Sequence, residues 1–184
     1  MEYPTAASKV RRAGLWPRII FGLVTLAAPL AHAESEYAVK AAYLNNFAKM
    51  VKWPSSAFAN SQAPLVIGVV GRDPFGGLDS VLRGQMAGNR NIEVRRVSSS
   101  DAAGLQACHL VYVSAAERVA NVARAVQGRP VLVVAETEDA ARDGGIIGFV
   151  MQERKLKLEI NNDAARQVRI SIPSDILEMA RIVK

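Results

Sequence analysis

The stretch Leu65-Val-Ile-Gly-Val-Val70 decides the fold class, because it is a short, uninterrupted apolar run that ends at a glycine, Gly71. Runs of this kind are typical of strands that are buried on both faces of a parallel sheet. Further apolar runs follow along the chain, each after a loop with a short helical pattern. Strands are therefore also expected at residues 92–97, 109–113 and 131–134.

The connections between these runs predict helices. Short helices are expected at residues 77–83 and 101–107, and Ser114 with Glu117 three residues later gives the capping-box pattern that starts another helix. The apolar side of that helix consists of Val119, Val122 and Val126. Strands that alternate with helices at these spacings predict an α/β fold, a mostly parallel sheet flanked by helices on both faces.

The C-terminal part of the chain has a different pattern. Residues 146–151 and 155–160 are two runs joined by a short polar link, and the second run alternates apolar with charged side chains. This pattern predicts a C-terminal antiparallel β-hairpin at a sheet edge. The residues expected to face inward are Leu156, Leu158 and Ile160, and those expected to face outward are Lys155, Lys157 and Glu159.

Three further helices complete the expected fold. Two of them follow the hairpin, at residues 162–167 and 174–183, the second capped by Ser174. The third covers residues 37–52 and ends before Pro54, which disfavours helical backbone at the residue before it. Its apolar stripe is a row of Val39, Tyr43, Phe47 and Met50 with Leu44, Ala48 and Val51 beside it.

Residues 1–33 have the layout of a secretory signal peptide. A basic start ends at Arg18, an apolar run covers residues 19–30, and Ala31-His32-Ala33 gives an A-x-A site, so we expect cleavage after Ala33. The apolar run is shorter than the roughly 20 residues that a membrane-spanning helix needs. An uncleaved anchor or a buried helix is the alternative. We expect a soluble periplasmic protein with one α/β domain, residues 34–184.

Composition narrows the classes of function. The chain has 184 residues, 50% of them hydrophobic and 22% charged, which excludes disorder and is compatible with one core. Its formal net charge is +6, but four of its basic residues lie in the segment expected to be removed. The charge therefore gives little reason to expect a nucleic-acid partner. A single cysteine excludes an intrachain disulfide and a cysteine-cluster metal site.

The loop at residues 71–77 is the first candidate binding site. It lies between a predicted buried strand and a helix, where backbone N–H groups can hold an anion. It has neither the Lys-Ser/Thr of a phosphate-binding loop nor the glycine spacing of a dinucleotide site. A plain turn is the favoured interpretation, and a ligand or anion loop made by Gly71, Arg72, Gly76 and Gly77 is the alternative.

Cys108 and His109 are the other candidates for chemistry. Neighbours in a strand point to opposite faces and cannot share a proton, so they do not form a nucleophile–base pair. Cys108 is expected to be a small core residue and His109 a structural histidine, since one histidine without an acidic cluster is a poor metal site. The sequence predicts no catalytic, cofactor or metal site, and hence no enzyme.

Several motifs together resemble the YfiR-like family of exported bacterial proteins. The most specific is YAVKAAYLNNFAKMVKWP at residues 37–54. The others, in chain order, are GRDPF at 71–75, Cys108-His109, Gly144-Gly145, LEIN at 158–161 and AAR at 164–166. The resemblance covers residues 36–183, essentially all of the chain after the expected cleavage site.

The resemblance implies a periplasmic regulator. Members of the family repress a membrane-bound diguanylate cyclase by engaging its periplasmic part, which lowers cyclic di-GMP and biofilm formation. In the best-known arrangement a peptidoglycan-associated outer-membrane lipoprotein sequesters the repressor. The family fold is an α/β sandwich that tends to form homodimers. Some relatives have a disulfide from the strand equivalent to residues 65–70 to the position of Cys108, and here Cys108 has no partner cysteine.

The sequence does not define the surface that would bind a cyclase. The expected edge strand and its neighbours are plausible contributors, because an exposed edge beside apolar residues can accept a partner. The residues selected for this surface are Phe149, Lys155, Leu156 and Lys157. The alternative function is a periplasmic protein that binds a small molecule near residues 71–77, as a sensor or a solute carrier.

Overall fold

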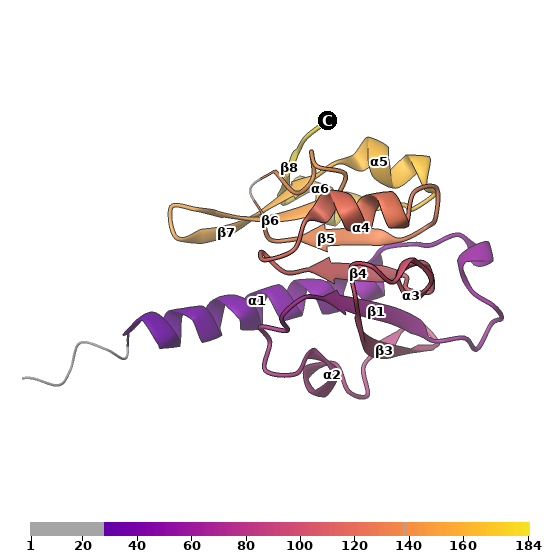
Figure 1. The fold of residues 1–184 in the computed structure, drawn as a ribbon, viewed down its shortest axis with the longest axis horizontal. Helices are drawn as coiled ribbons and strands as arrows, with labels where there is room; N and C mark the ends of the chain where they lie inside the picture. Colours follow the sequence, from indigo (N-terminus) through magenta and orange to yellow (C-terminus); the bar gives the residue numbers. More distant parts are fainter. Residues whose placement is uncertain (1–27, 138) are drawn as a thin grey trace, which may run out of the picture.

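A computed structural model describes residues 28–137 and 139–184, with side chains from Glu36 onward. Figure 1 shows the fold. The helices are α1 Ala28–Met50, η1 Ser55–Ala57, α2 Leu78–Val81, α3 Ala102–Gln106, α4 Val119–Ala125, α5 Asn162–Gln167 and α6 Ser174–Glu178. The strands are β1 Leu65–Val70, β2 Met86–Ala87, β3 Arg90–Val97, β4 Leu110–Val113, β5 Leu132–Ala135, β6 Ile147–Gln152, β7 Lys155–Ile160 and β8 Ala180–Ile182.

The strands form one eight-stranded sheet in the order β2-β3-β1-β4-β5-β6-β7-β8. Strands β3, β1, β4, β5 and β6 run parallel to their neighbours, whereas β2 and β7 are antiparallel to β3 and β6. The predicted α/β fold with a mostly parallel sheet and a C-terminal hairpin is confirmed. No helix within the described part of the chain is long and apolar enough to cross a membrane.

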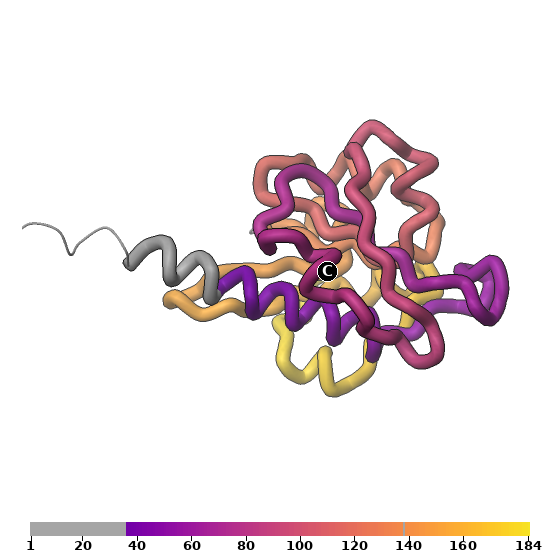
Figure 2. Tube along the Cα trace, turned by 90° about the horizontal axis from the view of Figure 1, so that it is seen from below, coloured from indigo at the N-terminus to yellow at the C-terminus, as the bar shows by residue number. Residues whose placement is uncertain are grey.

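Helices cover both faces of the sheet (Figures 1 and 2). Leu65, Ile67 and Val69 of β1 contact the core beneath α1 and α2, while Val66 and Val70 contact a second core that includes residues of α3 and α4. All six residues of β1 are buried, as the apolar run predicted. The sheet therefore separates two cores, and α1 lies across its larger one.

Helix α1 differs from the prediction at both ends. It begins at Ala28, well before Tyr37, because alanine and glutamate continue a helix readily. It ends at Met50, since Lys52 forms a backbone bridge with Ser171. The predicted row was also rotated: Val39 and Met50 are exposed. The buried face consists of Ala41, Leu44, Phe47, Ala48 and Val51. Residues 1–27 of the expected signal peptide lie outside the described residues.

The predicted cap at Ser114 is wrong. Helix α4 begins only at Val119, after Arg118, whose extended backbone (φ −84°, ψ 111°) interrupts the helical pattern. The N–H of Ser114 donates instead to the carbonyl of Val70, so this residue continues the pairing of β4 with β1. The buried side of α4 was predicted correctly and consists of Val119, Val122 and Val126.

The C-terminal helix was predicted too long. Helix α6 stops at Glu178, its N-cap is Pro173 in place of Ser174, and residues 180–182 form β8. Strand β8 runs parallel to β7, and the N–H of Val183 donates to the carbonyl of Ile160. At the base of the hairpin, β8 and not β7 is therefore the edge strand of the sheet. Glu159, predicted to face outward, is 2% exposed and pairs with Arg181 of β8.

Candidate functional site

The β6–β7 hairpin is the most prominent feature at one end of the molecule. β6 pairs with β5 only through Ile147 and Gly148, and β7 pairs with β8 only from Leu158 onward. The distal half of the hairpin, residues 149–157, is therefore a two-stranded ribbon that projects from the body (Figure 1). We call this segment the arm.

The turn at the end of the arm is strained. Glu153 and Arg154 both have positive φ values, 50° and 62°. Two such residues between paired strands are typical of a type I′ turn, in which asparagine and glycine are preferred because other side chains resist this conformation. The backbone at the tip is thus held by the pairing of β6 with β7 and not by the preference of its own residues.

The residues selected for a partner surface fall into two groups. Lys155 and Lys157 are exposed on the arm, and Leu156 is half-buried against the larger core. Phe149, in contrast, is 3% exposed and stacks on Phe47 of α1 with ring centroids 6.2 Å apart. Phe149 is therefore a core residue, and the arm offers a partner its two lysines and Leu156.

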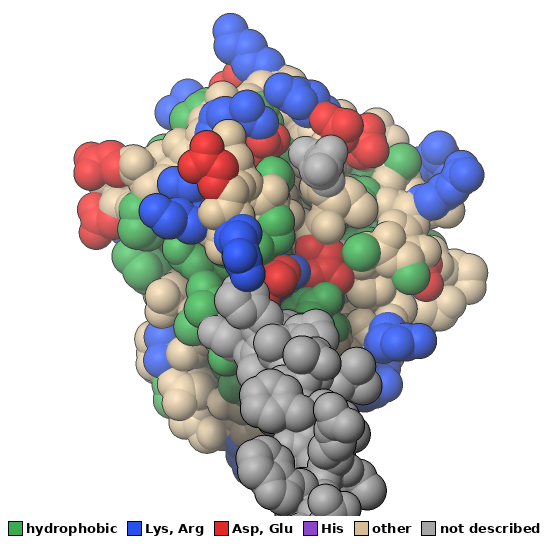
Figure 3. All heavy atoms as spheres, turned by 90° about the vertical axis from the view of Figure 1, so that its left-hand side faces the viewer, with side chains coloured by type: hydrophobic (Ala, Val, Ile, Leu, Met, Phe, Trp, Pro, Cys, Tyr) green, Lys and Arg blue, Asp and Glu red, His purple; other side chains and the backbone are tan. Residues whose placement is uncertain are grey.

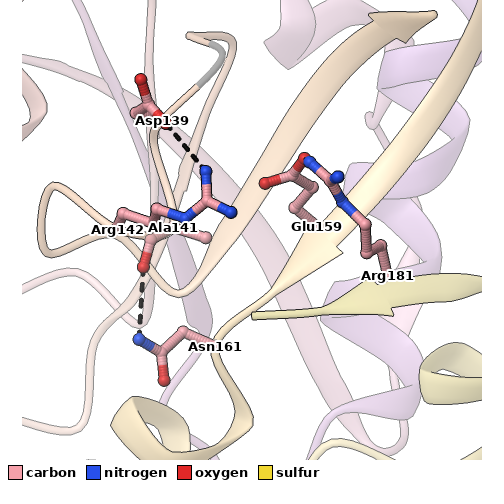
Figure 4. A network of polar contacts seen from close by, with 6 residues as sticks. All are labelled: Asp139, Ala141, Arg142, Glu159, Asn161 and Arg181. Atoms are coloured by element: carbon pink, nitrogen blue, oxygen red, sulfur yellow. Dashed lines mark hydrogen bonds and ion pairs between the residues drawn. The ribbon is translucent and has the colours of Figure 1, made fainter. Parts of the chain in front are cut away.

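The base of the hairpin is held in place by polar contacts (Figure 4). The side chain of Asn161 donates to the carbonyl of Ala141 and accepts from the N–H of Ala164, so it joins the β5–β6 connection to the start of α5. Arg181 of β8 pairs with Glu159 of β7. The arm is thus anchored at its base while its tip extends beyond the sheet.

A buried ion cluster lies where α1 crosses the carboxyl end of β5. The ammonium of Lys40 is 2.7 Å from Glu136 and 2.6 Å from Glu36, and only 4% of Lys40 is exposed. Burial alone lowers the pKa of Lys40, but its hydrogen bonds to Glu136 and Glu36 outweigh burial and raise that pKa. The other carboxylate oxygen of Glu136 accepts from the N–H of Ala115. The cluster therefore fixes α1 to the loops after β4 and β5.

Figure 3 views the molecule from the end at which the hairpin projects and α1 emerges. Basic side chains lie beside apolar ones on this end. A hollow of about 300 Å³ separates α1 from β6 and is lined by residues that include Tyr37, Lys40, Glu136 and Met151. This end of the molecule thus combines the arm, the N-terminal half of α1 and the buried ion cluster.

The loop at residues 71–77 is a compact turn. Asp73 accepts from the N–H groups of Phe75 and Leu78, at 2.9 and 3.2 Å. The carboxylate of Asp73 therefore uses donors that an anion would need. Gly71 has φ 84°, and an added Cβ would lie 2.3 Å from the hydroxyl of Ser114, so close approach requires glycine there.

The predicted ligand residues of this loop are only partly brought together. Arg72 and Gly76 line an open hollow of about 660 Å³ with Tyr37 and Phe75, whereas Gly77 has φ 108° and precedes α2. An anion site made by Gly71, Arg72, Gly76 and Gly77 stays a prediction. The geometry favours the plain turn.

The carboxyl ends of β1 and β4 form a topological switch point, because the chain leaves β1 toward β3 on one side and enters β4 on the other. Ligands of open α/β sheets bind at such points. Among the described residues, the buried hydroxyls of Tyr112 and Ser114 have no hydrogen-bond partner there. Burial, followed by the nearby charge of Glu136, raises the pKa of Tyr112. Topology and these two hydroxyls were not visible in the sequence.

His109 is a structural histidine, as expected. Its Nδ1 accepts from the N–H of Val66 at 3.0 Å, and its Nε2 lies 3.1 Å from the carbonyl of Ala57, so the ring is neutral with the proton on Nε2. The ring stacks on Phe58, and burial lowers the pKa of His109. Both ring nitrogens are occupied by structural hydrogen bonds.

Cys108 lies in the core on the other side of the sheet, next to Val111. Burial raises the pKa of its thiol to about 11, which disfavours the reactive thiolate. Within residues 36–137 and 139–184, no group of three or more His, Cys, Asp or Glu side chains is arranged to hold a metal ion.

Comparisons with known proteins place the sequence in context. A family model described as YfiR/HmsC-like matches residues 37–181. One similar solved structure is the ABC domain in complex with L-Trp from Streptococcus pneumonia (14% identity, TM-score 0.49, covering 64% of this chain and 55% of that chain). Another is a conserved domain protein from Vibrio cholerae O1 biovar eltor (18% identity, TM-score 0.49, 65% and 55%). The chain thus spans about half the length of both. No curated protein matches it.

Proposed function

Because the chain belongs to the YfiR/HmsC-like family, we propose that it binds an inner-membrane diguanylate cyclase from the periplasm and represses it. The family consists of periplasmic regulators of diguanylate cyclase systems. Repression lowers cyclic di-GMP and with it biofilm formation. The match over residues 37–181 is the observation that carries this proposal, and it supports a regulatory role.

The arm is the proposed contact with the cyclase. Its lysines are exposed, its tip extends beyond the sheet, and its base is fixed by Asn161 and by the pair of Glu159 with Arg181. A projecting ribbon with a fixed base loses little conformational freedom when it binds, which favours affinity. The part of α1 that follows the expected cleavage site, on the same end of the molecule, is a second contributor.

Repression requires that the protein prefer one state of the cyclase. A ligand shifts a two-state equilibrium only by the difference between its affinities for the two states. The arm is therefore proposed to fit the inactive arrangement of the periplasmic part of the cyclase better than the active one. A peptidoglycan-associated outer-membrane lipoprotein that bound the repressor would lower its free concentration and release the cyclase.

The remaining proposals concern processing and assembly. The exported chain begins at Glu34 after removal of residues 1–33, and residues 34–184 act as one domain. The protein acts as a homodimer, as the family fold tends to. None of these proposals requires a cofactor, a metal ion or a nucleic acid.

The contact can be tested by photo-crosslinking in living cells. A photoreactive amino acid replaces Lys157 on the arm in one strain and Arg83, an exposed residue distant in sequence from the arm, in a matched control strain. We expect a crosslinked product from position 157 that contains a membrane diguanylate cyclase, and none from position 83. A product from position 157 that contains only a second copy of this chain would contradict the proposed contact.

A second function has one observation in its favour. The unpartnered buried hydroxyls of Tyr112 and Ser114 lie at the switch point where ligands of such sheets bind, which suits a periplasmic small-molecule sensor. A thermal-shift panel of small metabolites tests it. A ligand that stabilises the wild type but not the Ser114→Ala variant would favour this function, and a silent panel would count against it.

A further inference from the structure

One position in the sheet is empty beside the arm. Strand β8 pairs with residues 158–160 of β7, and α6 ends in the chain just before β8 begins. On the side of β7 that faces away from β6, no described strand lies next to residues 155–157. A hollow of about 450 Å³ lies beside this position, over the face of the sheet that carries Lys157, and is lined by residues of β6 and β7 together with Met179 and Arg181. Residues 155–157 of β7 therefore have an unpaired edge, which neither β8 nor α6 covers.

The backbone of Leu156 faces this empty position. The carbonyl of Ile160 accepts from Val183, so residue 160 directs its backbone groups toward β8. Backbone groups of alternate residues in a strand point to the same side, and Leu158 and Leu156 therefore share this direction. The N–H and C=O of Leu156 are one donor and one acceptor with no strand partner among the described residues.

The side chains at this edge alternate in character. Lys155 and Lys157 lie on one face of β7, and Leu156 lies on the other face, opposite Met151 of β6. Met151 is 45% exposed, so the face that carries Leu156 also presents an exposed apolar side chain. A neighbouring strand would therefore meet two positive charges on one face and an apolar surface on the other.

We infer that the edge of β7 at Lys155, Leu156 and Lys157 accepts an extended partner segment as an added strand in line with β8, and that this segment alternates acidic and apolar residues. Opposite charges directly across two strands stabilise a pair, and like charges destabilise it. Added strands gain affinity from main-chain hydrogen bonds and specificity from alternate side chains. This inference rests on the proposed function, because it specifies how the arm would recognise the cyclase.

Lysines on a free edge also have a protective role in many proteins, since they prevent sheets from joining edge to edge. The two roles make different predictions. A protective lysine keeps all strands away, whereas a recognition site binds a strand of opposite charge. The test must therefore measure binding and self-association in the same variants.

The probe is a short synthetic peptide of alternating glutamate and valine, titrated into isotope-labelled protein purified from the periplasm. We expect amide shifts confined to the arm and β8. A peptide with the same composition in two blocks, and one with lysine in place of glutamate, should bind at least about tenfold more weakly. Two further peptides carry N-methyl groups on alternate nitrogens, one on the odd-numbered residues and one on the even-numbered residues. Only one of the two should lose binding, because only one set of N–H groups faces β7.

Protein variants separate charge from backbone. K155E/K157E should bind the lysine peptide more tightly than the glutamate peptide, the reverse of the wild type. The control Arg83→Glu should leave the affinities for both peptides unchanged. L156P should lose both peptides because proline has no N–H, whereas L156V should retain binding. Proline is tolerated where a strand N–H faces outward, so L156P should remain folded, and its far-ultraviolet circular dichroism checks this.

Three results would overturn the inference. The first is equal binding of the two N-methylated peptides, and the second is an unchanged peptide preference in K155E/K157E. The third is self-association of K155Q/K157Q together with no peptide binding by the wild type. Cyclic di-GMP in cells separates the two claims. If the wild type represses and L156P represses equally, strand addition is wrong and the proposed function stands. If the peptide binds as expected and the wild type does not repress, the proposed function is wrong and the edge recognises another protein.

Discussion

Gly68 of β1 faces the thiol of Cys108, and a Cβ atom placed on Gly68 would lie 2.8 Å from the Sγ of Cys108. That distance is too short for a non-bonded contact. It suits a disulfide, in which the Cβ of one cysteine is two bonds away from the Sγ of the other. The family resemblance implies a disulfide between this strand and the position of Cys108 in some relatives.

Gly68→Cys should therefore form a disulfide with Cys108 on oxidation. The closed loop is long enough for a gain of about 2–4 kcal/mol in the free energy of unfolding relative to the reduced form. Reduced Gly68→Cys should be less stable than the wild type because its side chain overpacks the core. Chemical denaturation with and without reductant measures both effects. The control Gly68→Ala should show no dependence on reductant, and a Gly68→Cys protein that keeps two free thiols after oxidation would refute the predicted geometry.

Acid should destabilise the fold through His109. Burial lowers the pKa of His109 below its ordinary value of 6.5, so the unfolded chain binds a proton more readily than the folded protein. The stability contributed by the neutral ring is complete above about pH 6.5 and is lost as the pH falls below it. The free energy of unfolding of the wild type should decline more steeply between neutral and mildly acidic pH than that of His109→Asn. Parallel pH profiles would contradict this assignment.

The ion pair of Lys40 with Glu136 should be costly to break from one side. Both side chains are almost fully buried, at 5% and 6% exposure. Lys40→Met leaves the carboxylate of Glu136 buried without its partner and should lower the free energy of unfolding by about 3 kcal/mol. The double variant K40M/E136Q should recover a large part of that loss, because no charge remains buried. A double variant that is as unstable as the sum of its single variants would show that the two residues are not coupled.

The turn at the tip of the arm should accept a stabilising change. Glu153 and Arg154 have positive φ values that Asn and Gly adopt more easily. E153N/R154G should raise the free energy of unfolding by about 1 kcal/mol. Thermal unfolding measures this gain, and the reverse substitution at a helical site, Arg124→Gly in α4, provides a contrasting loss. An unchanged or lower stability of E153N/R154G would show that the tip is not strained.

The central strands were predicted correctly from the sequence, because their apolar pattern is compatible with only one kind of secondary structure. Leu65 to Val70 is apolar at every residue, and only a strand covered on both faces fits so short a run. The hairpin was equally clear, because β7 alternates along its length. In these elements local pattern and tertiary environment agree.

The errors arose where tertiary contacts decide between two local patterns. The residues after Glu178 have helical spacing, but the free edge of β7 offers them backbone partners, and they form β8. Ser114 has the pattern of a helix cap, yet its N–H completes the pairing with β1. Neither of these backbone pairings can be predicted from the local sequence.

The site was predictable only in part. The exposed lysines of the arm follow from alternation, whereas Phe149 required the position of α1 to be recognised as core. The contact of Lys40 with Glu136 joins residues 96 positions apart, and the switch point depends on strand order. Such long-range features have no local signal in a single sequence.

The central claim is that the exported protein restrains a diguanylate cyclase, and intracellular cyclic di-GMP tests it most directly. The measurement compares a deletion strain with strains that express either the full chain or a version without residues 1–33. We predict that cyclic di-GMP rises on deletion and returns to the wild-type level only with the full chain. An unchanged level on deletion, or full restoration by the version without residues 1–33, would contradict the account.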